Sequence, residues 1–263
     1  MSGEEVLVAL EGSGSIAVVT LSRPQVLNAL NTAMAGRLGE VLDDLSARPG
    51  VRVLVLTGAG DRAFCAGADL KERLGMTPGQ WTLQHRLFER TFWKLRNLRK
   101  PVFAAVHGHA MGGGAELAMS TDFIICSQTA RFGLPEVSRG IQPGSGGTQL
   151  LPRRVPQGMA LQLLMTGETI DAAEAYRIGL VNKVLPGPGL RPAALELASR
   201  IARNSPGAVQ QAKHAALLGA GHSLEHGIEI ELACYQRMVD HPDRHEGVSA
   251  FNEKRTPTFL DTL

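Results

Sequence analysis

Two glutamates, Glu116 and Glu136, carry the chemistry that this sequence predicts most clearly. Glu116 follows a glycine run in MGGGAEL (residues 111–117), and Glu136 follows a proline in FGLPE (residues 132–136). Glycine lets backbone N–H groups approach a ligand closely, and proline fixes the backbone immediately before Glu136. Two positioned carboxylates can divide the roles of general base and general acid. We therefore predict an acid/base enzyme in which Glu116 and Glu136 are the catalytic residues.

The glycine run before Glu116 predicts a site for negative charge. The apolar residues Val102–Val106 are typical of a buried strand, and the residues from Glu116 onward are typical of a helix start. A strand that enters a helix through glycines presents free N–H groups and the positive end of the helix dipole. Such a turn would stabilise an oxyanion that develops during a reaction.

Each glutamate also has a simpler interpretation without catalysis. Glu116 could complement the dipole of its helix from the first turn, and Glu136 could be a solvated loop carboxylate. The presence of both acids behind two similar turns favours a shared catalytic site. The sequence does not assign the role of acid or base to either glutamate, because closely placed carboxylates titrate as a pair.

The composition indicates a globular protein with a large core, since 44% of the 263 residues are hydrophobic. A net charge of +2, from 27 basic and 25 acidic residues, gives little reason to expect bulk binding to nucleic acid or membranes. Cys65, Cys126 and Cys234 are too scattered for a disulfide framework or a metal site and are predicted to be free thiols. Without a signal-peptide pattern or an apolar run of membrane-spanning length, we expect a cytoplasmic protein.

The apolar patterns predict a mixed order of strands and helices. A hairpin is expected at the start, followed by a helix that Asn31 caps. The expected strands are Val6–Leu10, Ile16–Leu21, Val51–Thr57, Val102–Val106, Phe123–Cys126 and Val181–Leu185, and a helix is expected around Trp81 to Leu98. An acidic residue lies behind a turn three times, at Asp69, Glu116 and Glu136, which suggests a repeated strand–turn–helix unit.

A boundary is expected at residues 186–189 (PGPG), which separate a core of residues 1–189 with the catalytic site from a helical region of residues 190–263. Helical periodicity covers Leu195–Ala202, Ala208–Leu218 and Leu224–Val239. Their apolar faces are too extensive for a freely solvated appendage. They include Ile201, Val209, Leu217, Leu218, Ile228, Leu232 and Met238. We expect these faces to be buried against the core or against a neighbouring subunit.

Other motifs point to competing functions and are weaker. Residues 58–63 (GAGDRA) fit the dinucleotide pattern GxGxxA, but turn signals fill residues 64–69, where that pattern requires a helix. Ser145 in PGSGG lacks the first glycine of the nucleophile motif GxSxG. His107 and His109 lack the partners of a metal site, so we interpret them as satisfied structural histidines.

Two basic clusters suggest an RNA-binding alternative. Arg96, Arg99 and Lys100 form one cluster, and Arg153 and Arg154 form the other. We interpret both as solvated helix ends, although either could meet a phosphate. The small net charge and the absence of interleaved aromatic and basic residues argue against nucleic-acid binding as the main function.

The order and spacing of these motifs resemble the crotonase (enoyl-CoA hydratase/isomerase) superfamily over nearly the whole chain. The matching segments are RPQVLNAL (23–30), AFCAGADLKE (63–72), GGGAELA (112–118), FGLPE (132–136), GSGGTQ (144–149) and EGVSAFNEKR (246–255). The resemblance implies an α/β fold, a crotonase-like spiral of ββα units with a C-terminal helical trimerisation region. It also implies acyl-CoA substrates, self-association as a trimer or a dimer of trimers, and no metal or cofactor besides the coenzyme A of the substrate.

Carried over by position, the resemblance places an oxyanion hole on the backbone N–H groups of Ala68 and Gly113. It matches Glu116 and Glu136 to the catalytic pair of hydratases. Members that keep both acids typically add water across the α,β double bond of an enoyl-CoA, and we predict this reaction.

The resemblance also assigns residues to coenzyme A. The loop from Ala66 to Lys71, with Asp69 and Leu70, would line the adenine and pantetheine. Phe251 and Lys254 occupy family positions near the nucleotide, where an aromatic ring and a cation would suit adenine and phosphate.

The resemblance leaves the reaction and the acyl group open. A double-bond isomerase is the alternative enzyme. Residues 63–73 (AFCAGADLKER) and 233–235 (ACY) are also similar to methylglutaconyl-CoA hydratases, some of which bind RNA, and carnitinyl-CoA dehydratase is another relative. Variable segments such as Met76–Phe92 are expected to form the acyl pocket.

Overall fold

Two β-sheets form the frame of the protein. The structure, a computed structural model, describes residues 5–261. The first and last residues of the two predicted domains, 1 and 263, therefore lie outside the described residues. The larger sheet has the order β1-β2-β3-β5-β7-β10, and the smaller sheet has the order β4-β6-β8-β9. The strands are β1 (Val6–Glu11), β2 (Ile16–Leu21), β3 (Val53–Gly58), β4 (Ala63–Cys65), β5 (Val102–Val106), β6 (His109–Met111), β7 (Phe123–Ser127), β8 (Arg131–Gly133), β9 (Thr169–Asp171) and β10 (Lys183–Leu185).

Successive strand pairs spiral between the two sheets. β3, β5 and β7 are parallel neighbours in the larger sheet, and the strand that follows each of them, β4, β6 or β8, joins the smaller sheet in the same order. This arrangement confirms the predicted α/β spiral of ββα units. The three predicted turns with an acidic residue follow β4, β6 and β8. Because these strands are parallel neighbours, the three turns lie at one edge of the smaller sheet.

The helices expected after Asn31, around Trp81 to Leu98 and in the C-terminal region are present, together with shorter ones. The α-helices are α1 (Thr32–Ala47), α2 (Leu70–Arg73), α3 (Pro78–Arg96), α4 (Gly113–Met119), α5 (Gly147–Leu150), α6 (Gln157–Thr166), α7 (Ala172–Arg177), α8 (Leu190–Ala202), α9 (Pro206–Gly219), α10 (Leu224–Val239) and α11 (Pro242–Glu253). Asn31 caps α1, since its Oδ1 accepts a hydrogen bond of 2.8 Å from the Met34 N–H. Asp171 caps α7 in the same way.

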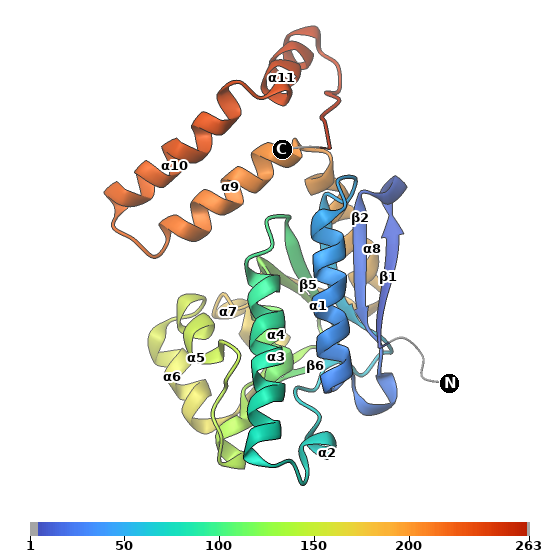
Figure 1. The fold of residues 1–263 in the computed structure, drawn as a ribbon, viewed down its shortest axis with the longest axis vertical. Helices are drawn as coiled ribbons and strands as arrows, with labels where there is room; N and C mark the ends of the chain where they lie inside the picture. Colours follow the sequence, from blue (N-terminus) through green and yellow to red (C-terminus); the bar gives the residue numbers. More distant parts are fainter. Residues whose placement is uncertain (1–4, 262–263) are drawn as a thin grey trace.

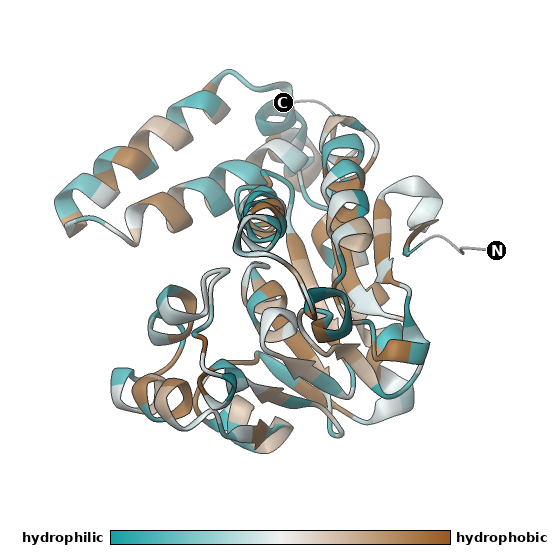
Figure 2. Ribbon diagram, turned by 60° about the horizontal axis from the view of Figure 1, so that its bottom comes forward, coloured by the Kyte–Doolittle hydropathy of each residue, from teal (hydrophilic) through white to brown (hydrophobic). Residues whose placement is uncertain are grey.

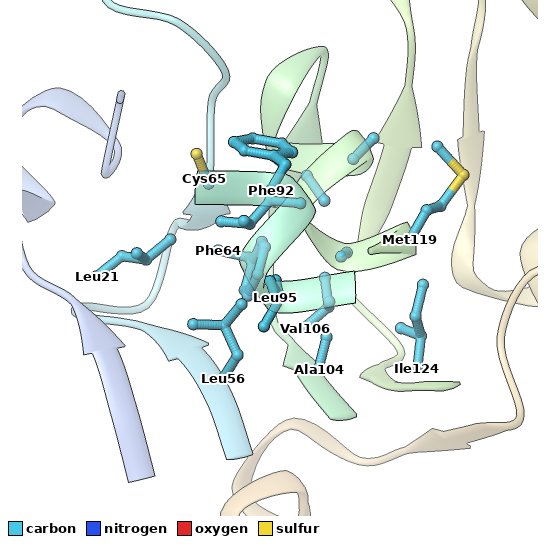
Figure 3. Close-up of a cluster of buried hydrophobic side chains, with 14 of the residues drawn as sticks. Leu21, Leu56, Phe64, Cys65, Phe92, Leu95, Ala104, Val106, Met119 and Ile124 are labelled. Carbon is cyan, nitrogen blue, oxygen red and sulfur yellow. The ribbon is translucent and has the colours of Figure 1, made fainter. Parts of the chain in front are cut away.

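The main core lies between the larger sheet, the smaller sheet, α1 and α3. In the part drawn in Figure 3, Phe64 of β4 and Phe92 and Leu95 of α3 gather beside Leu56 and Val106 of the larger sheet. Complete burial of each such side chain stabilises the fold by about 1.5–3 kcal/mol. This core fixes β4, which ends at the first turn of the candidate site, and β5, which leads through β6 to the second turn.

The C-terminal helices divide into one that packs on the sheet and three that project from it. α8 covers the other face of the larger sheet, where Ala194, Ala198 and Ala202 pack with apolar residues of β2, β3, β5 and β7. α9 and α10 form a hairpin that extends away from the sheets (Figure 1). It is followed by α11, a helix that the apolar patterns did not predict separately. The projecting helices therefore begin at α9, one helix later than the predicted boundary between residues 189 and 190.

A buried ion pair joins α9 to the larger sheet. The Lys213 ammonium lies 2.8 Å from the Asp122 carboxylate and donates a hydrogen bond of 2.9 Å to the Lys100 carbonyl. The other oxygen of Asp122 accepts a hydrogen bond from the Val102 N–H, the first residue of β5. The projecting hairpin is thus anchored at the start of β5.

The interpretation of the basic clusters as solvated helix ends is wrong for two residues. Lys100 is only 7% exposed, and its ammonium donates to the carbonyl groups of Leu45 and Arg48 at the end of α1. Arg154 donates to the Met119 and Thr121 carbonyls. Both cations satisfy backbone carbonyls that would otherwise be unpaired, so neither is available to a phosphate.

Two further motifs have a structural explanation. Ala63 begins β4 where the dinucleotide pattern requires a helix, so residues 58–63 are no dinucleotide-binding turn. The interpretation of the histidines as satisfied is wrong for His107, because its buried Nε2 has no hydrogen-bond partner among the described residues. Its burial lowers the pKa of the imidazole, which favours the neutral ring.

Candidate active site

A cavity of about 980 Å³ opens where the turns after β4, β6 and β8 meet α3. The first turn contributes Ala66, Gly67 and Ala68, and the second contributes Met111, Gly112, Gly113 and Glu116. The third turn, which continues into the 3-10 helix η3 (Pro135–Arg139), contributes Pro135, Glu136, Val137 and Arg139. α3 closes the cavity with Trp81, His85 and Phe88. The spiral therefore brings both predicted catalytic glutamates and both predicted oxyanion-hole residues to one cavity.

Ala68 and Gly113 lie side by side because the first two turns are packed without side chains between them. A Cβ added to Gly113 would lie 3.7 Å from the Ala68 nitrogen. Gly67 has a φ of +93°, and a Cβ there would lie 2.8 Å from the Met111 carbonyl oxygen. Any larger residue at position 67 would separate the two turns. Their close contact allows two N–H groups to bind one oxyanion.

Asn28 holds the segment that leads into β4, the strand before the first turn. Its side chain is fully buried, and its Nδ2 donates hydrogen bonds of 2.9 Å and 2.8 Å to the Ala59 and Ala63 carbonyls. Its Oδ1 accepts from the Arg23 N–H. The segment RPQVLNAL thus acts as a scaffold, which the sequence motif alone did not reveal.

Glu116 lies on the first turn of α4 and is only 3% exposed. Its Oε1 accepts hydrogen bonds of 2.8 Å from both the Ser145 and Gly147 N–H groups. Burial raises the pKa of this carboxyl above its usual value, and the two N–H groups and the charges of His85 and Arg73 offset only part of this rise. Ser145, rejected as a nucleophile, therefore positions a glutamate through its backbone, a role that has no sequence signal of its own.

Glu136 is half-buried on η3 and is held differently from Glu116. Its buried Oε2 has no hydrogen-bond partner among residues 5–261. Burial is the main cause that raises its pKa to about 7, and the negative charge of Glu116 contributes in the same direction. A Cβ added to Gly112 would lie 2.9 Å from its Oε1, so the glycine run also makes room for this carboxyl.

The two carboxyl groups thus differ in their capacity to hold a proton at neutral pH. N–H donors stabilise the charged form of Glu116, while the lack of a partner favours the neutral form of Glu136. A pair of acids with separated proton affinities can act as base and acid in one reaction.

Only some residues of the loop assigned to coenzyme A line the cavity. Ala66, Ala68 and Leu70 line it. Asp69 pairs with Arg23 at 2.9 Å and caps α2 by accepting from the Lys71 and Glu72 N–H groups. The Lys71 side chain is exposed and lies outside the cavity lining.

Phe251 and Lys254 lie at the end of α11 and are not brought to the cavity of their own chain. The Phe251 side chain is 83% exposed, and Lys254 adopts a left-handed conformation that ends the helix. Their assignment to the nucleotide therefore stays a prediction.

The cavity contains cationic and aromatic residues that sequence reasoning did not identify individually. Arg73, Trp81, His85, Phe88 and Arg139 all line it. Three of them fall in the segment Met76–Phe92, which was expected to form the acyl pocket. Arg73 follows the loop assigned to coenzyme A, but no sequence pattern indicated that it faces the cavity.

Among the described residues, no group of histidine, cysteine and acidic side chains could hold a metal ion. No helix between residues 5 and 261 is long and apolar enough to cross a membrane.

Comparisons with known proteins agree with this arrangement. The family described as enoyl-CoA hydratase/isomerase matches residues 11–262. The short-chain-enoyl-CoA hydratase of Clostridium acetobutylicum is 43% identical, with 94% of this chain and 95% of the relative covered. The (E)-benzylidenesuccinyl-CoA hydratase of Thauera aromatica is 41% identical, with coverage of 96% and 98%. The crystal structure of an enoyl-CoA hydratase from Bacillus anthracis superposes with a TM-score of 0.96 at 40% identity and covers 98% of this chain and 100% of its own. The chain belongs to the enoyl-CoA hydratase/isomerase family.

Proposed function

We propose that this protein is a hydro-lyase that adds water reversibly across the α,β double bond of an enoyl-CoA thioester. The observation that carries the proposal is the convergence of Glu116 and Glu136 on one cavity beside the N–H groups of Ala68 and Gly113. Hydration needs these three elements: a base for water, an acid for carbon, and a site for the negative charge of the enolate.

The geometry supports a division of roles between the glutamates. Glu116, charged and held by two N–H groups, takes a proton from water while the water oxygen bonds to the β-carbon. The electron pair of the double bond moves onto the thioester oxygen, which the Ala68 and Gly113 N–H groups stabilise. Glu136, with a pKa of about 7, then gives its proton to the α-carbon. Water and the thioester supply all reacting atoms, so the reaction requires no further cofactor.

Family membership and the relatives support the enzyme class that the sequence predicted. Relatives at about 40% identity include hydratases of quite different acyl groups, one named for short chains and one for benzylidenesuccinyl-CoA. The class of reaction is therefore better defined than the acyl group.

The direct test follows the absorbance of the conjugated thioester in a panel of straight and branched enoyl-CoA esters. We expect the absorbance to fall and a 3-hydroxyacyl-CoA to form. A protein that hydrates none of these esters, although it binds coenzyme A thioesters and is folded, would contradict the proposal.

Isomerisation is the second candidate, because the family description includes it and both reactions pass through the same enolate. An isomerase moves a proton between carbons and consumes no water. Incubation with a β,γ-enoyl-CoA distinguishes the two: conjugated ester that forms much faster than any hydroxyacyl-CoA would favour the isomerase.

The projecting helices support a proposal of self-association as a trimer or a dimer of trimers. Leu217 and Leu218 of α9 and Ile228 and Leu232 of α10 are at least 46% exposed. Figure 2 shows apolar segments along this hairpin, where no other part of the same chain covers them. We expect Leu217→Asp combined with Leu232→Asp to reduce the mass measured by light scattering after size exclusion. The control Leu161→Asp, at an exposed leucine of α6, should leave it unchanged.

Coenzyme A is proposed to bind along the loop from Ala66 to Lys71. Phe251 and Lys254 would act on the nucleotide of a neighbouring subunit, since neither lines the cavity of its own chain. If so, Lys254→Gln weakens coenzyme A binding only in the assembled protein.

A further inference from the structure

Arg73 is a half-buried cation on the wall of the cavity. Its guanidinium lies 4.3 Å from the ring centroid of Trp81 and 5.5 Å from that of Phe88. Burial against these rings lowers the pKa of Arg73, although the group remains charged at any physiological pH. A cation in such surroundings has lost part of its hydration and benefits from an anion nearby.

No carboxylate within residues 5–261 forms an ion pair with Arg73. Glu72, the adjacent acid, directs its carboxylate elsewhere: it accepts hydrogen bonds of 3.0 Å from the Thr32 N–H and 2.6 Å from Gln84 Nε2. Among residues 5–261, the Arg73 guanidinium makes one hydrogen bond, from Nε to Gln84 Oε1, at 2.8 Å. The two terminal nitrogens of the guanidinium, which carry its paired donors, are therefore left for a ligand.

The orientation of the guanidinium is fixed before a ligand binds. Gln84 is only 5% exposed, and it is itself held by Thr32 and Glu72. The rings of Trp81 and Phe88 hold the stem and the plane of Arg73 on the other side. An arginine fixed in this way can bind a carboxylate through two parallel hydrogen bonds with little loss of conformational freedom.

Arg73 is close to the reacting atoms without touching them. The charge of Arg73 lowers the pKa of Glu116, and the charge of Glu116 raises that of Arg73, but the two form no contact. Both side chains line the same cavity, so an acyl group whose β-carbon lies at Glu116 can extend along its wall toward Arg73. Arg139 adds positive charge to the same cavity, opposed by Glu116 and Glu136.

We propose that the acyl group of the substrate carries a second carboxylate, separated from the thioester by a short chain, and that Arg73 binds it. This inference rests on the proposed function, because it names the class of enoyl-CoA that the same site accepts. A neutral acyl chain would cover Arg73 and leave its terminal nitrogens without a partner, which is unfavourable. Arg73 would thus be the residue that distinguishes acidic from neutral acyl groups.

Arg73 could instead act only on the charge of Glu116, in which case it would affect all substrates equally. The ratio of kcat/KM for an acidic acyl group to kcat/KM for a neutral one separates these roles. Glutaconyl-CoA and crotonyl-CoA share the α,β double bond, but only glutaconyl-CoA carries a carboxylate at the end of its acyl group. We expect the wild-type kcat/KM to be at least 10-fold higher for glutaconyl-CoA, the effect of about one charge-assisted hydrogen bond.

We expect Arg73→Gln to lower the ratio of the two kcat/KM values by about 10- to 100-fold. Arg73→Lys should restore part of the ratio, since it returns the charge without the planar donors. The matched control is Arg90→Gln, which removes a positive charge from an exposed position of α3 outside the cavity and should keep the wild-type ratio. A wild-type ratio near one, or an equal loss for both substrates in Arg73→Gln, would overturn the proposal.

Binding of saturated esters tests Arg73 independently of the reaction. By calorimetry, the wild-type protein should bind glutaryl-CoA at least 10-fold more tightly than butyryl-CoA, and Arg73→Gln should remove this difference. Retention of this preference by a protein that hydrates no enoyl-CoA would reject the proposed function but keep the carboxylate site. Equal wild-type affinities would reject the carboxylate site even if Arg73→Gln fails to fold.

Discussion

The turns at residues 112–116 and 132–136 are built alike but hold their glutamates differently. Each follows a short strand of the smaller sheet and leads into a helix, α4 in one case and η3 in the other. Glu116 is almost fully buried and accepts two backbone N–H groups, whereas Glu136 is half-buried and its Oε2 has no partner within the described residues. Two glutamates at equivalent positions of the repeated unit therefore bind a proton with different affinity, because their neighbours differ.

The difference arises from a segment outside the repeat. The loop of residues 144–147 supplies the N–H groups that hold Glu116, whereas Glu136 Oε2 accepts no hydrogen bond from the described residues. A duplicated turn can thus acquire separate acid and base roles when one distant loop pairs with only one copy.

The strongest test of this comparison is the removal of each carboxyl charge. Glu116→Gln and Glu136→Gln should each lower kcat for hydration by about 10²–10⁴-fold, the usual contribution of a positioned base or acid. The measurement is loss of enoyl-CoA absorbance at saturating substrate, with circular dichroism as the check on folding. Folded variants that both keep near wild-type turnover would contradict the mechanism.

The pH dependence should report the proton on Glu136. This residue is the proposed acid, and burial raises its pKa to about 7. Its proton is lost as the pH rises, so kcat/KM should fall about 10-fold per pH unit above that value. Profiles between pH 5 and 9 measure the effect. A flat alkaline limb, or the same limb in Glu136→Gln, would assign the titration to another group.

Gly112→Ala tests the space in which Glu136 lies. Gly112 has a φ of +51°, and the added Cβ would lie 2.9 Å from Glu136 Oε1, so the carboxyl or the turn must move. We expect kcat/KM to fall by about 10- to 100-fold, as expected for a displacement of about 1 Å at a catalytic group. Gly158→Ala, at an open position of α6, is the control and should retain full activity.

The smallest expected effect is on stability. The unfolded chain gives Glu136 a pKa of about 4.3, and the folded protein raises it to about 7. The folded state therefore favours the protonated form, and this contribution, complete below about pH 4, is lost as the pH rises through 7.

Glu136→Gln removes this dependence, because glutamine stays neutral. We expect its free energy of unfolding to exceed that of the wild type by about 1–2 kcal/mol at pH 8, after allowance for partial exposure, and to match it at pH 4. Urea unfolding at both pH values measures the difference. An unchanged stability at pH 8 would indicate that Glu136 is better solvated than the structure suggests.

Sequence reasoning predicted the elements with clear periodicity. The opening hairpin, the cap at Asn31 and the buried strands β5 and β7 were all expected from local pattern. Both glutamates and the glycine turn were also expected, because strand, turn and helix follow one another in the chain. These features depend on neighbours within a few residues.

Features that depend on distant contacts could not be predicted. Nothing in the local pattern of Lys100 or Arg154 indicates that carbonyl groups more than 30 residues away bury them. The same holds for the partners of Glu116 in residues 144–147, and for Arg73, whose place on the cavity wall depends on how α2 meets α3.

The contact of Lys213 with Asp122 and Lys100 has a mechanical consequence. It fastens the projecting hairpin to the first residues of β5, the strand that leads through β6 to the glycine turn. A rotation of the hairpin about this point would therefore also move the start of β5. A neighbouring subunit that binds α9 and α10, as proposed, would therefore be positioned relative to the glycine turn.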